Sequence, residues 1–253
     1  MREQTDDEKD NVEKLNELKK TSGSKNKKGE YKYGQEGRRF SEKLGKFIKR
    51  YEKMIDKIKD GEKNSKQLEI INKALGLWKD PDKNNSYRKE VKSGAWKAGQ
   101  AKCNKFVGDV LGKDAKLEDR NFWFTGNRYP RADEWADERK YNSKFPVISY
   151  IFYGGVSLGK EWRKPEPGDI VSHGLPGGGS NTAHVGINLS DDVYISATEN
   201  KKYGQTGGVI IKLMPKDAKL TYRDVSGKRP NITPAIMDPF GRPYVPHKNN
   251  DRK

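Results

Sequence analysis

The chain has one cysteine and three histidines among its 253 residues. A single cysteine excludes an internal disulfide framework and a cysteine-rich zinc site. The histidines, His173, His184 and His247, lack the i, i+4 spacing of helical zinc ligands, so we expect no metal. The lone Cys103 must therefore be inert, intermolecular or reactive.

Long apolar stretches are also missing. No run approaches the roughly 20 apolar residues that a membrane span needs, so we expect no membrane-spanning helix. The first twenty residues, MREQTDDEKDNVEKLNELKK, contain no apolar stretch, and we expect no Sec signal there. Apolar residues make up 32% and charged residues 35%, so only part of the chain can pack tightly. Five Trp, twelve Tyr and eight Phe can still build a core.

The charge balance is strongly positive, with 52 Lys and Arg against 36 Asp and Glu, a formal net charge of +16. The positive electrostatic potential of such a chain favours an anionic partner, for example nucleic acid, acidic lipid or a cell-wall polymer. Solubility alone explains it equally well. Residues 171–200 contain no Lys or Arg. This gap, and the lack of a known nucleic-acid motif, count against nucleic acid as the partner.

The composition divides the chain into three regions. Residues 1–38 are rich in Lys, Glu, Asp, Asn and Gly and predict a flexible charged segment, with one short, weakly amphipathic helix. Residues 39–90 predict a helical hairpin that packs on the following domain. Residues 91–253 predict an α+β domain that ends in a proline-rich tail.

Two helices are predicted within 39–90. Apolar residues recur every three or four positions from Phe40 onward, with Ser41 suited to cap the helix and Asp60 near its end. The second helix contains the apolar positions Leu68 to Trp78 and ends before a proline.

A further helix begins at Cys103 and ends at Gly112. Its spacing places five side chains on one face: Cys103, Phe106, Val107, Val110 and Leu111. Later segments predict short strands joined by turns, which we expect to form an antiparallel meander. They read PEPGDIVSH, AHVGINLS, VYISATE and GGVIIKLM.

Cys103 in the first turn of a helix is a candidate nucleophile, because free N–H groups and the helix dipole favour a thiolate. Lys102 and Lys105 add positive charge nearby. The alternative is a buried structural thiol. A thiolate enzyme also needs an imidazole. His184 opens a strand after a glycine-rich loop and is the first choice, and His173 is the second.

A third group should orient the imidazole. Strand alternation makes Ser196 the nearest neighbour in register. Asn200 and Glu199 at the strand end are chemically better suited. The residues leave these alternatives open.

Three blocks together resemble the NlpC-type and CHAP-type papain-like cysteine peptidases: KCNKFVGDVL, PGDIV and AHVGINL. The resemblance covers roughly residues 94–213 and is closest to amidase-like toxin domains of type VI secretion or Rhs proteins. It implies a papain-like core in which the helix bearing the cysteine packs on a small antiparallel sheet. It also implies hydrolysis of amide bonds in peptidoglycan stem peptides, with Ser196 at the third position.

Two departures from the family pattern stand beside the cysteine, where Lys102 and Asn104 replace the common Asp and Ser. Upstream, Trp96 and Gln100 are the candidates for an oxyanion site, together with the Cys103 backbone N–H. In the implied mechanism Cys103 attacks the amide carbonyl, His184 protonates the leaving amine, and no cofactor takes part.

The sequence therefore predicts a cysteine amidase or peptidase, secreted as an antibacterial effector without a Sec signal and acting in the periplasm or cell wall. Its partners would be peptidoglycan or a peptide, and an immunity protein in the producing cell. The alternatives are a basic nucleic-acid-binding module and an inactive relative that binds muropeptides.

Overall fold

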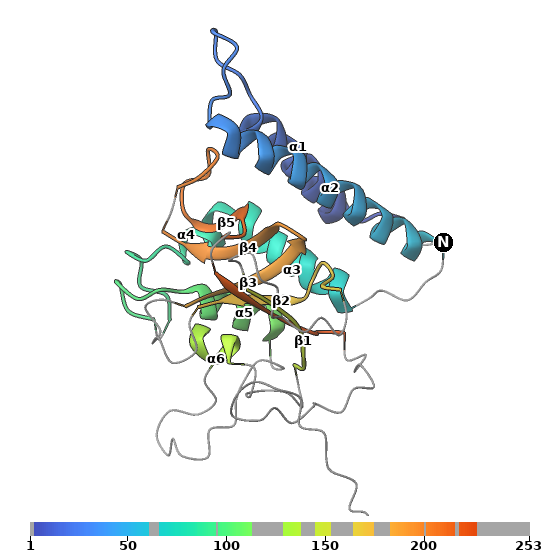
Figure 1. The fold of residues 1–253 in the computed structure, drawn as a ribbon. Helices are drawn as coiled ribbons and strands as arrows, with labels where there is room; N and C mark the ends of the chain where they lie inside the picture. Colours follow the sequence, from blue (N-terminus) through green and yellow to red (C-terminus); the bar gives the residue numbers. More distant parts are fainter. Residues whose placement is uncertain are drawn as a thin grey trace, which may run out of the picture.

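The structure, a computed structural model, describes residues 3–60, 66–94, 96–112, 129–137, 145–152, 164–174, 183–199, 201–215 and 218–226. It has an α+β fold of helices and one antiparallel sheet, as expected (Figure 1). The helices are α1 (Asp6–Ser22), α2 (Gly34–Lys59), α3 (Lys66–Lys79), α4 (Pro81–Asn85), α5 (Cys103–Leu111) and α6 (Ala132–Ala136). The strands are β1 (Val147–Phe152), β2 (Ile170–His173), β3 (His184–Ser190), β4 (Val193–Thr198), β5 (Gly208–Leu213) and β6 (Lys219–Arg223).

The sheet has the order β1-β6-β2-β3-β4-β5, and each neighbouring pair is antiparallel. The predicted meander is confirmed as β2 to β5. The sequence did not predict β6, which comes last in the described chain and lies between β1 and β2. The proline-rich tail and His247 lie outside the described residues.

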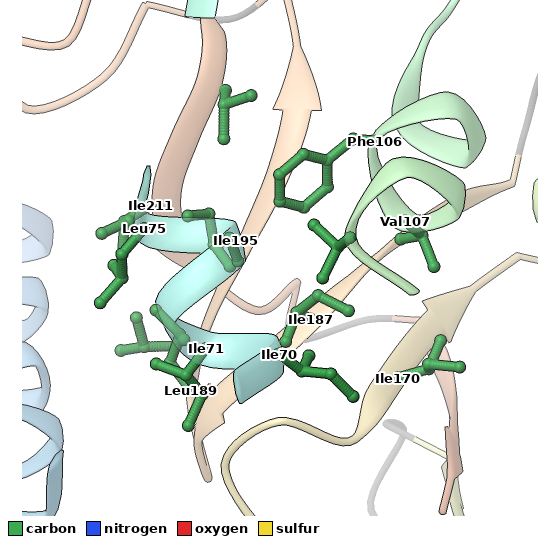
Figure 2. Packing of buried hydrophobic residues seen from close by; sticks show 14 of the residues in the cluster. Ile70, Ile71, Leu75, Phe106, Val107, Ile170, Ile187, Leu189, Ile195 and Ile211 are labelled. Carbon is green, nitrogen blue, oxygen red and sulfur yellow. The ribbon is translucent and has the colours of Figure 1, made fainter. Parts of the chain in front are cut away.

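Helices α3 and α5 cover one face of the sheet. Apolar side chains of both helices pack there against alternate residues of the strands (Figure 2). Those labelled in Figure 2 are Ile70, Ile71 and Leu75 of α3, Phe106 and Val107 of α5, and Ile170, Ile187, Leu189, Ile195 and Ile211 of the strands. The five residues predicted to share the α5 face are all buried. Intervening strand residues, together with Met214 directly after β5, form a second buried cluster: Ile148, Val171, Tyr194, Met214, Leu220 and Tyr222.

The N-terminal region differs from the expectation. The short helix expected there is α1, but it is longer and better ordered by its contacts than predicted, and Thr5 caps it in a reciprocal pair of hydrogen bonds with Glu8. Helix α1 packs along α2 (Figure 1), and Leu15 is fully buried between the helices. Helices α2 and α3 contact each other, as a hairpin requires, but α2 packs chiefly on α1.

The helix ends follow the sequence only in part. Helix α2 begins at Gly34 rather than near Phe40, and Ser41 is not its cap, because the Ser41 hydroxyl donates to the Lys19 carbonyl at 2.9 Å. Asp60 ends α2 as predicted. Pro81 ends α3 and itself begins α4. None of the helices in the described ranges is both long and apolar enough to cross a bilayer.

Candidate functional site

Cys103 is the first residue of α5, and its side chain is only 4% exposed. The backbone N–H groups of Val185 and Asn104 lie close enough to the sulfur to lower the pKa of the thiol. These amides favour the thiolate, but burial dominates and raises the pKa of the Cys103 thiol. The expectation of a lowered pKa is therefore wrong for this arrangement, and the thiol is protonated at neutral pH.

The two lysines expected to activate the thiol are occupied elsewhere. Lys102 is buried, and its ammonium donates to the backbone carbonyls of Arg88 and Val91. Lys105 forms an ion pair with Asp109 one turn along the helix. Neither lysine lowers the pKa of the thiol.

His184 begins β3 directly opposite His173 of β2, and the two ring centroids are 5.3 Å apart. The Tyr194 ring from β4 packs edge-on against both imidazoles, 6.0 Å from His184 and 6.2 Å from His173. Tyr194 reaches them by crossing Gly186, where a Cβ atom would lie 2.8 Å from the ring. The glycine of the AHVG block thus makes room for the tyrosine.

Cys103 and His184 both lie near the start of β3, because the sulfur lies close to the amide of the next residue, Val185. Helix α5 packs on the sheet face of Val185 and Ile187, whereas His184 lies on the opposite face with Tyr194. The described contacts of the imidazole, however, are with His173 and Tyr194, and they include no hydrogen bond to the sulfur. The Nε2 atom of His184 is buried without a hydrogen-bond partner in the described part of the chain. Burial, with the charge of Lys212, holds the pKa of His184 well below 6.5. The pair is thus a neutral thiol and a neutral imidazole.

Neither of the two described candidates for the third residue orients the ring. The Ser196 hydroxyl is fully buried and donates to the Val185 carbonyl at 2.5 Å. Glu199 forms an ion pair with Lys89 at 2.8 Å. Asn200 lies outside the described residues. Tyr194 and His173 supply the ring contacts instead.

The oxyanion candidates upstream of α5 are held within their own loop. The exposed Gln100 side chain accepts a hydrogen bond from the Lys97 backbone N–H at 2.8 Å. Trp96 pairs with Ser93 through two backbone hydrogen bonds of 3.0 Å. The Cys103 backbone N–H, in the first turn of α5, is the remaining candidate donor near the sulfur.

A pocket of about 710 Å³ opens on the sheet face that carries the imidazoles. His173, Tyr194 and Lys212 line it from three strands, and the first turns of α2 line it from the side. Burial lowers the pKa of His173 to about 4 and that of Lys212 to about 8. The sequence did not single out Lys212; strand alternation, which places it beside Tyr194, was the signal available.

We expect the thiol to react slowly in the folded protein. Iodoacetamide should alkylate Cys103 at pH 7 at least about tenfold more slowly than it alkylates the urea-unfolded chain, because the thiol is buried and protonated. Intact-mass spectrometry reports this directly, since the chain has one cysteine. Equal rates in the two states would contradict the burial of the thiol.

No group of three or more His, Cys, Asp or Glu side chains that could hold a metal ion occurs among the described residues. In comparisons with known proteins, no family model matches the chain, and neither does any curated protein.

Proposed function

We propose that this protein is a cysteine amidase with a papain-like core. One observation carries the proposal: the sulfur of the only cysteine lies at the start of a helix, beside the amide of the residue that follows His184. A helix N-terminus supplies N–H groups to an oxyanion, and an imidazole at the adjacent strand end can exchange a proton with the thiol.

The chemistry requires the His184 ring to move when substrate binds. The His184 ring turns from Tyr194 towards the sulfur and takes the thiol proton, and the thiolate attacks the amide carbonyl. The Cys103 backbone N–H donates to the oxyanion. The imidazolium then protonates the leaving amine, and water hydrolyses the resulting thioester to a carboxylic acid and the free thiol.

The proposed substrate is the stem peptide of peptidoglycan, and the proposed setting is that of an exported antibacterial effector. The resemblance of the three sequence blocks supports both points. A net charge of +16 also suits a protein that works on an anionic cell wall. An immunity protein in the producing cell would then bind over the Cys103 site.

The experiment is to incubate the purified protein with isolated sacculi and to measure newly released amino groups and soluble fragments. We expect release by the wild type. Absence of any release over heat-inactivated protein would exclude peptidoglycan as the substrate. A panel of peptide amides would then decide whether another amide is cut.

The burial of the thiol favours a second candidate, an inactive relative that binds muropeptides. Such a protein would bind soluble stem peptides but release no amines from them. Calorimetric titration with those peptides, run beside the sacculus assay, separates the two functions.

A further inference from the structure

The pocket beside His173 is lined by both basic and apolar side chains. Arg39, Lys202 and Lys212 contribute its cations. Its apolar wall is made by Leu213, Met214, Pro215 and Ala218. A pocket with a few convergent polar groups on an apolar wall has the usual character of a small-molecule site.

Two of the three cations are already neutralised. Arg39 pairs with Asp192 at 3.2 Å, and Lys202 pairs with Glu36 at 2.9 Å. Lys212 has no carboxylate partner among the described residues. Its ammonium lies 5.1 Å from the centroid of the Tyr194 ring, over the ring face.

A half-buried ammonium over an aromatic ring recovers only part of the hydration that it loses. Burial accordingly lowers the pKa of Lys212 to about 8. An anion entering the pocket would gain an ion pair without breaking either of the existing ones.

We propose that this pocket binds the anionic group of a small ligand, a carboxylate or a phosphate, through the Lys212 ammonium. The Tyr194 ring lies beneath the ammonium, and the apolar wall takes the uncharged part of the ligand. The inference goes beyond the proposed amidase function and does not depend on it, because binding at Lys212 needs no reaction at Cys103. If both hold, the bound anion lies on the same sheet face as His184.

The experiment uses the full chain and three probes at pH 6.5: N-acetylalanine, inorganic phosphate and the uncharged N-acetylalaninamide. Calorimetry or chemical-shift titration should show saturable binding of at least one anion and none of the amide. Saturation by N-acetylalanine alone identifies a carboxylate site, and saturation by phosphate alone identifies a phosphate site.

Two variants assign the binding to Lys212. Lys212→Met should raise the Kd of the bound anion by about tenfold or more, because an ion-paired hydrogen bond is lost. Lys212→Arg should keep most of the affinity, which shows that the charge matters. The control Lys53→Met removes an exposed lysine of α2 and should leave the Kd within about twofold.

The Cys103→Ser protein should bind the anion as the wild type does, so loss of hydrolysis and loss of binding are separate results. Equal Kd values for wild type and Lys212→Met, or no saturable binding of either anion, would overturn the proposal.

Discussion

Replacing Cys103 by serine should reduce amide hydrolysis by at least about a thousandfold, because a hydroxyl beside a neutral imidazole is a far weaker nucleophile than a thiolate. The substitution exchanges one buried atom for a slightly smaller one, so the fold should persist. The measurement is the rate of amine release from sacculi, with unfolding midpoints in urea as the check on folding.

The same assay of amine release should be run on a matched pair of histidine variants. His184→Ala should lose activity to a similar extent, whereas His247→Ala should retain it. Activity in Cys103→Ser close to that of the wild type would show that the thiol is not the nucleophile, whatever the pocket binds.

Acid should destabilise the folded protein at a pH where most proteins are still stable. In the unfolded chain His173 takes up a proton near pH 6.5, but in the folded chain only near pH 4, because burial disfavours the charged ring. The unfolded state therefore binds more protons between these values, and stability falls as the pH falls. From pH 7.5 to pH 5 this imidazole alone should reduce the free energy of unfolding by about 2 kcal/mol.

His184 further reduces the free energy of unfolding as the pH falls, since burial lowers its pKa as well. Urea unfolding at pH 7.5, 6 and 5 measures the total. His173→Gln, which cannot take up the proton, should reduce the pH dependence and leave the His184 contribution. A free energy of unfolding that stays constant from pH 7.5 to pH 5 would contradict the burial of both rings.

Local patterns in the sequence predicted much of the fold. Helix α5 and the meander β2 to β5 were found because their apolar residues repeat at helical and strand periods. These periods arise because one face of each element is buried and must be apolar. The length and packing of helix α1 were underestimated from the sequence. Its few apolar residues, Leu15 among them, are stabilised by packing on α2, and a single-segment pattern does not contain that contact. The place of β6 depends on pairing with β1 and β2, which is a property of the whole sheet.

The sequence named the residues of the candidate site but not their arrangement. The sequence identified Cys103 and His184 and the strands and helix that bear them. It did not show that Tyr194 crosses Gly186 to reach the imidazole, because that contact joins neighbouring strands diagonally. Nor did it show that burial would outweigh the helix dipole at the thiol, since burial depends on the assembled core.

The most direct measurement is labelling of the single thiol by a substrate-like electrophile. The Cys103 sulfur, once deprotonated, displaces chloride from the methylene carbon of an alanine-derived peptide chloromethyl ketone and forms a stable thioether, which intact-mass spectrometry detects. We predict that it modifies Cys103 much faster than iodoacetamide does, and that His184→Ala abolishes this advantage. A folded protein whose thiol shows no preference for the peptide reagent, or that keeps the preference without His184, would contradict the pairing of Cys103 with His184.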